Sequence, residues 1–79
     1  MTHTYEHTDG GSSFTATITI WLDEDGELDW QIDSLAARRG GRPVHPDDVD
    51  VLRADLYCRR IPEFSAWLAD RLREYQEMV

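Results

Sequence analysis

An alternation of apolar and polar residues, over residues 14–22 and again over residues 27–34, constrains this chain more than any other feature. A period of two is typical of strands that bury one face and leave the other in solvent. The residues between the two runs, 23–26, read Asp-Glu-Asp-Gly, and a glycine at this place is a turn signal. We therefore predict a β-hairpin over residues 14–34.

The register of this hairpin follows from its two apolar faces, because cross-strand neighbours lie on the same face of a sheet. A two-residue loop at Asp25 and Gly26 would pair Leu22 with Asp29 and would bring polar residues onto the buried face. A three-residue loop, with Gly26 in the left-handed conformation, pairs apolar residues with each other. We predict the three-residue loop, whose cross-strand pairs are Leu22–Leu28, Ile20–Trp30 and Ile18–Ile32.

The predicted register divides the hairpin into an inner and an outer face. The inner face holds Phe14, Ala16, Ile18, Ile20, Leu22, Leu28, Trp30 and Ile32. The outer face holds Thr15, Thr17, Thr19, Trp21, Asp29, Gln31 and Asp33. We expect a function of the hairpin to lie on the outer face and at the acidic tip.

Size and charge limit the possible functions. The 79 residues suit one domain, spanning residues 1–79, with a thin core. The net charge of -8 argues against direct binding to nucleic acid or to an anionic membrane, and it favours a partner with a basic surface. Acidity that only keeps the protein soluble is an equally common reading. The chain has a single cysteine, Cys58, so it cannot form an internal disulfide, and we expect this thiol to be buried or half-buried. The sequence shows no apolar span and no signal peptide, so we expect a soluble cytoplasmic protein.

The segments that flank the hairpin are less regular. Residues 1–8 fit either an edge strand antiparallel to the first arm or a frayed tail. We expect His3 and His7 to be exposed polar residues, because no third ligand lies near enough to complete a metal site. Residues 35–45 contain three arginines around a Gly pair and lack a phosphate-loop pattern, so we expect a solvated connection between sheet and helix. These arginines are Arg38, Arg39 and Arg42.

Two helices are predicted in the second half. Proline suits the first helical position and carboxylates suit the first turn, so we expect a helix from Pro46 to about Arg60. Its N-cap is His45 by position, or Asp47 if the start shifts by one. A second helix is expected from Pro62 to about Met78. Its apolar stripe is Phe64, Trp67, Leu68, Leu72, Tyr75 and Val79. The fold class is therefore α+β, an antiparallel hairpin, with or without an N-terminal edge strand, followed by two helices packed on one face.

The chain shows no nucleophile with an adjacent base, no metal-ligand cluster and no cofactor loop, so we expect a protein that is not an enzyme and holds no cofactor or metal. Carboxylates around one aromatic residue can bind arginine and lysine side chains of a partner. The predicted partner-binding residues are Trp21, Asp23, Glu24, Asp25, Glu27, Asp29 and Asp33. The alternative is a solvated face on which the N-terminal strand covers Trp21.

In size, acidity and order of elements the chain resembles small phage-encoded anti-CRISPR inhibitors of type I systems. The resemblance covers the whole chain but includes no motif, so it transfers no functional residue. It implies an inhibitor that occupies a basic surface of the Cascade complex in the host cytoplasm and blocks DNA recognition, as a monomer or weak homodimer. The alternative function is that of a structural or accessory phage protein acting through self-association.

Overall fold

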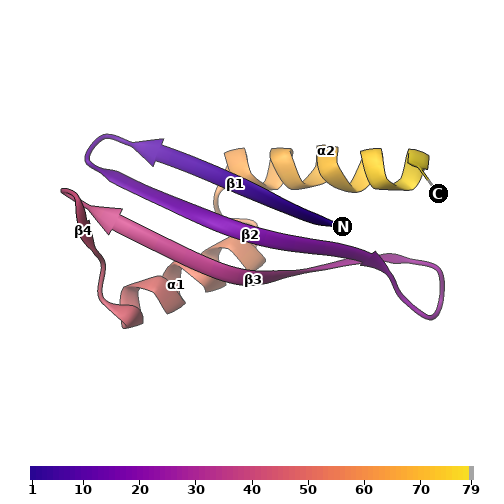
Figure 1. The fold of residues 1–79 in the computed structure, drawn as a ribbon, viewed down its shortest axis with the longest axis horizontal. Helices are drawn as coiled ribbons and strands as arrows, with labels where there is room; N and C mark the ends of the chain where they lie inside the picture. Colours follow the sequence, from indigo (N-terminus) through magenta and orange to yellow (C-terminus); the bar gives the residue numbers. More distant parts are fainter. Residues whose placement is uncertain (79) are drawn as a thin grey trace.

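A computed structural model describes residues 1–78 as an antiparallel sheet followed by two helices. The strands are β1 (Thr2–Asp9), β2 (Ser12–Leu22), β3 (Leu28–Arg39) and β4 (Arg42–Pro43), and the helices are α1 (Pro46–Tyr57) and α2 (Pro62–Met78). The strands lie in the order β1-β2-β3-β4, so each pairs with its neighbours in sequence. Both helices pack on the same face of the sheet (Figure 1). The predicted α+β arrangement of a hairpin and two helices is confirmed.

The predicted hairpin register is also confirmed. Leu22 lies opposite Leu28, and the next two apolar pairs follow as expected. Gly26 has a φ of 79°, the left-handed conformation that a three-residue loop requires. The alternation of side chains therefore sets the pairing of β2 with β3. Leu22 shares the register of the inner face, but 41% of its surface is exposed because it lies at the end of the strand.

Strand β3 is longer than predicted and contains a β-bulge. Ser34 pairs with Thr17 and Ile32 pairs with Ile18, which leaves Asp33 without a partner residue on β2. The extra residue moves the inward-facing positions from even to odd numbers, so Leu35 becomes an inner residue. The prediction of a connection over residues 35–45 was therefore wrong, because β3 continues to Arg39. The bulge interrupts the alternation of apolar and polar residues, so the pattern did not indicate this second half of the strand.

The N-terminal segment forms the edge strand β1, which pairs with β2 along its whole length, from Thr2 opposite Thr19 to Asp9 opposite Ser12. Its odd-numbered side chains point toward the helices. The expectation of exposed histidines was wrong, because His3 and His7 are half-buried on this inner face. The His7 ring stacks on an inner residue of β2, Phe14, with 5.1 Å between ring centroids.

The core lies between the inner face of the sheet and the two helices. Its buried residues are Tyr5, Phe14, Ala16, Ile18, Ile20, Leu56, Phe64 and Leu68. Helix α2 contributes two of them and follows the predicted stripe; the stripe residue Val79 lies outside the described residues. Helix α1 begins as predicted, with the Nδ1 of His45 accepting a hydrogen bond from the N–H of Asp47 at 3.1 Å.

Helix α1 ends at Tyr57, three residues earlier than predicted. Cys58 is the C-cap, and Arg59 has a φ of 59°, which ends the helical backbone. Pro62 then starts α2, because proline fits the first position of a helix and cannot continue the preceding one. Cys58 is exposed in this turn, so the expectation of a buried or half-buried thiol was wrong.

Candidate interaction surface

Asp23 organises the tip of the β2–β3 hairpin. Its Oδ1 accepts hydrogen bonds from the N–H groups of Asp25 and Glu27, both at 2.9 Å. Its own N–H donates to the carbonyl of Glu27 at 2.8 Å, and the N–H of Gly26 donates to the Asp23 carbonyl at 3.0 Å. Asp side chains favour such turns because they can bond to backbone groups nearby. Asp23 is therefore half-buried and holds the tip in one conformation.

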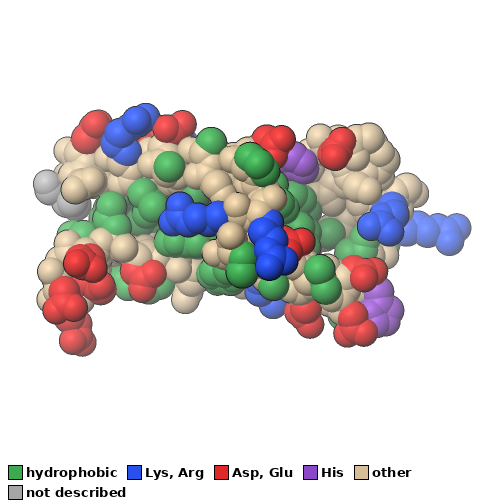
Figure 2. Space-filling view, turned by 180° about the vertical axis from the view of Figure 1, so that it is seen from behind, with side chains coloured by type: hydrophobic (Ala, Val, Ile, Leu, Met, Phe, Trp, Pro, Cys, Tyr) green, Lys and Arg blue, Asp and Glu red, His purple; other side chains and the backbone are tan. Residues whose placement is uncertain are grey.

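The other three tip carboxylates, Glu24, Asp25 and Glu27, are exposed. The molecule is 41 Å long, and the hairpin tip forms one end of it. Figure 2 shows acidic side chains gathered at this end. Among residues 1–78, no ion pair involves a tip carboxylate, so the charge of the tip is not neutralised by the protein itself.

Carboxylates on the helices have a different environment. Four of them lie between 2.9 and 3.6 Å from an arginine nitrogen. They are Asp50, Asp55, Asp70 and Glu74. Half of the eight carboxylates on the helices are therefore paired with an arginine, whereas among the described residues none of the tip carboxylates is.

Two predicted site residues on the strand make contacts within the protein. Asp29 accepts a hydrogen bond from the N–H of Trp30 at 2.8 Å. Asp33, the bulge residue, accepts one from the side-chain amide of Gln31 at 2.7 Å and one from the hydroxyl of Thr19. Both carboxylates remain exposed on the outer face. They extend the acidic surface from the tip along β3, but part of their hydrogen-bonding capacity is already used.

Trp21 lies on the outer face, directly opposite Asp29. The indole is half-buried, not freely exposed as predicted. Strand β1 flanks it without pairing with it, because Met1 lies opposite Ile20, one residue before Trp21. Trp21 and the tip carboxylates thus lie at the same end of the sheet, where the aromatic ring offers a partly accessible apolar contact.

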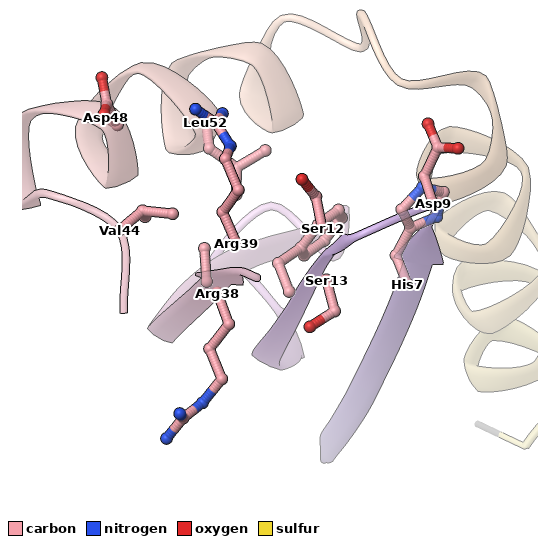
Figure 3. Close-up of a pocket in the computed structure, with 11 residues that line it drawn as sticks. His7, Asp9, Ser12, Ser13, Arg38, Arg39, Val44, Asp48 and Leu52 are labelled. Atoms are coloured by element: carbon pink, nitrogen blue, oxygen red, sulfur yellow. The ribbon is translucent and has the colours of Figure 1, made fainter. Parts of the chain in front are cut away.

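A pocket of about 230 Å³ lies at the opposite end of the sheet, next to the start of α1. Figure 3 shows Arg39 reaching toward Leu52 of α1 beside this pocket, whereas Arg38 points the other way. Its lining combines Phe14 and Leu52 with charges of both signs, including Asp48. The sequence did not reveal this pocket, because its walls come from four separate segments.

Tyr5 is the titratable group with a clear pKa shift. Burial raises the pKa of its hydroxyl, and the negative charge of Glu63 raises it further. The ring packs against Phe64 and Trp67, with centroid distances of 5.3 and 5.1 Å, and its hydroxyl lies 3.3 Å from the Nδ1 of His7. A perturbed pKa can indicate a reactive group in a cleft. Here the shift follows from packing in the core.

Among residues 1–78, no three histidine, cysteine or carboxylate side chains come together to hold a metal ion. Within the same range, neither helix is long and apolar enough to span a membrane. No protein-family model, curated protein or solved structure matches the chain. The function must therefore be inferred from the fold and from the geometry of the hairpin.

Proposed function

We propose that the protein is a non-enzymatic interaction module whose acidic hairpin tip binds a basic, nucleic-acid-binding surface of a partner protein. One observation carries the proposal: Glu24, Asp25 and Glu27 are exposed on a protruding turn, and no arginine of residues 1–78 pairs with them. Trp21, Asp23 and Asp29 support them from the same end of the sheet, and Asp33 extends the acidic face to the middle of β3.

The internal hydrogen bonds of Asp23 favour such binding. They hold the turn before the partner arrives, so less conformational entropy is lost on association. Carboxylates form strong charge-assisted hydrogen bonds with arginine and lysine, and unbalanced charge accelerates association with a surface of opposite sign. A surface built to neutralise phosphates carries these basic residues, which is why we infer a nucleic-acid-binding partner.

The resemblance to anti-CRISPR inhibitors suggests a specific partner to test. We propose a type I Cascade complex in the cytoplasm of a host cell, with the acidic tip occupying a basic surface that would otherwise contact DNA. The role of the protein would be inhibition by occupancy, without direct contact to nucleic acid.

The test is capture of a purified Cascade complex by the tagged full chain. The double variant Glu24→Lys/Asp25→Lys reverses two tip charges and leaves the hydrogen bonds of Asp23 in place. We expect about 10-fold to 100-fold weaker binding, because charge-assisted contacts are lost and repulsion replaces them. Binding of the unmodified protein should weaken as salt increases.

The matched control is Asp9→Lys/Asp47→Lys, which changes the net charge by the same amount at exposed positions at the other end of the molecule. Binding should fall much less in this variant. Equal losses in both double variants would mean that net charge, and not the tip, drives capture. Absence of capture by the unmodified protein would exclude Cascade as the partner.

A second candidate function is that of a structural or accessory phage protein acting through self-association. One observation favours it, the exposed outer edge of β1. It predicts no capture of a basic partner, and this absence distinguishes it, because an oligomer that high salt does not dissociate is compatible with either function.

A further inference from the structure

Strand β1 has an open outer edge. The backbone groups of Met1 and Ile20 exchange two hydrogen bonds, both of 2.9 Å. Hydrogen-bonded pairs alternate along an antiparallel ladder, so the odd-numbered residues of β1 bond to β2. The even-numbered residues direct their N–H and C=O groups away from the sheet. These residues are Thr2, Thr4, Glu6 and Thr8.

The opposite edge of the sheet is partly occupied by contacts within the protein. On β3, the N–H of Trp30 donates to the Asp29 side chain, and the N–H of Ile32 donates to the Tyr57 hydroxyl, both at 2.8 Å. Farther along, the carbonyl of Ala37 accepts from the N–H of Val44 at 3.1 Å. No side chain of residues 1–78 makes such a hydrogen bond to the even-numbered backbone groups of β1.

Strand β1 also has few of the features that protect an edge from pairing, since Glu6 is its one carboxylate between Thr2 and Thr8. It contains no lysine and no proline, and its register with β2 is continuous, without a bulge. An exposed edge with these properties is a template for another strand.

We propose that this edge pairs with β1 of a second copy of the chain, in antiparallel orientation, with the two-fold axis at Tyr5. The outward backbone groups belong to even-numbered residues, so even-numbered residues of one copy must pair with even-numbered residues of the other. Three registers near the middle of the strand meet this condition, with the two-fold axis at Thr4, Tyr5 or Glu6. A centre at Glu6 would place two carboxylates opposite each other, and a centre at Thr4 would place Thr8 beyond the start of the partner's β1 strand, which begins at the position of Thr2. A centre at Tyr5 avoids both costs. It pairs Thr2 with Thr8 of the second copy, and Thr4 with Glu6 of the second copy.

This register is complementary in side chains as well as in backbone groups. The hydroxyl of Thr4 can donate to the carboxylate of Glu6 across the interface, twice because of the symmetry, and threonine pairs stabilise antiparallel strands. The edge carries one charged side chain between Thr2 and Thr8, in a protein of net charge -8. It is therefore a strip on which two acidic copies can approach without opposing carboxylates.

The dimer would form a continuous eight-stranded sheet with all four helices on one face. The two hairpin tips would point in opposite directions, because the paired strands are antiparallel. The dimer does not depend on the proposed function of the tip, but it would present the acidic surface twice. Two tips in one particle could bind repeated basic surfaces with increased avidity.

The first measurement is sedimentation of the full chain over a range of concentrations, combined with amide hydrogen exchange by NMR. We expect conversion from a species of 9.2 kDa to one of twice that mass. As the dimer forms, the amides of Thr4 and Glu6 should become protected, whereas those of His3 and Tyr5 should be protected at every concentration. Salt should maintain or tighten the dimer by screening the net charge, the opposite of its effect on the tip.

The decisive variant is Thr4→Pro, which removes an outward N–H and no hydrogen bond to β2. We expect at least about 10-fold weaker dimerisation, because symmetry removes the bond on both sides of the axis. Thr4→Val keeps the N–H and should dimerise about as well as the unmodified chain. Thr4→Glu opposes Glu6 of the second copy and should also weaken the dimer, which tests the register without proline.

The result that would overturn the inference is a chain that remains monomeric throughout, or a dimer in which Thr4 and Glu6 exchange as fast as in the monomer. Equal dimerisation of Thr4→Pro and Thr4→Val would also overturn it. Protection of His3 and Tyr5 in each variant establishes that β1 still pairs with β2. Partner capture by a monomer would leave the proposed function intact while rejecting the dimer.

Discussion

The hydroxyl of Tyr57 accepts a hydrogen bond of 2.8 Å from the backbone N–H of Ile32. The two residues are 25 positions apart in sequence and join the last turn of α1 to the free edge of β3. The Tyr57 ring also stacks on Trp30, with 4.9 Å between ring centroids and 19° between planes. One side chain thus anchors the helix and occupies part of a sheet edge at the same time.

Tyr57→Phe should remove the hydrogen bond and keep the ring stacking. We expect the free energy of unfolding to fall by about 1 kcal/mol, because the N–H of Ile32 loses its protein acceptor. Urea unfolding measures the change. Tyr75→Phe is the matched control, since the Tyr75 hydroxyl makes no hydrogen bond within residues 1–78, and the two variants should differ clearly.

Leu56→Ala should test the contribution of α1 to the core. Leu56 is 0% exposed, and truncation of a buried leucine costs about 2–5 kcal/mol. Val51 on the same helix is 61% exposed, so Val51→Ala should change stability by no more than about 0.5 kcal/mol. Thermal unfolding followed by circular dichroism compares them. Similar losses in both variants would contradict the burial of Leu56 against the sheet.

Gly26→Ala should destabilise the hairpin tip. With a φ of 79°, an added Cβ is strained whatever space surrounds it, and we expect a loss of about 1 kcal/mol. Gly11→Ala, in the β1–β2 turn, is the control, because Gly11 does not have a left-handed φ and no atom lies within 4 Å of the added Cβ. Chemical denaturation of the two variants measures the difference. Equal stabilities would show that the tip does not need its left-handed residue.

Stability should decline at alkaline pH through Tyr5. The pKa of Tyr5 is raised in the folded state, first by burial and then by Glu63, so folding favours the neutral hydroxyl. This contribution is fully present below the ordinary tyrosine pKa of about 10 and is lost as pH rises from there through the folded-state value. Denaturant unfolding across this range should show a steeper decline for the unmodified chain than for Tyr5→Phe. Parallel declines would show that Tyr5 does not contribute.

Local pattern was sufficient for much of the fold. The alternation in β2 and the first half of β3, with glycine at position 26, determined the hairpin register, because only one loop length aligns the apolar faces. Proline, histidine and two aspartates at the start of α1 determined its first turn. The charge of the tip was likewise visible in the sequence, but its availability was not, because that depends on where the arginines lie.

The hairpin, the two helices and the acidic tip could be predicted from the sequence, since each depends on neighbours in the chain or on a repeated period. Three features became apparent only in the folded molecule: β3 continues past a bulge at Asp33, His3 and His7 turn inward, and internal contacts occupy part of one sheet edge but not the other. These features depend on contacts between segments that are distant in sequence, such as the contact of Tyr57 with Ile32. Such contacts stabilise the protein only when the sheet and the helices are packed together.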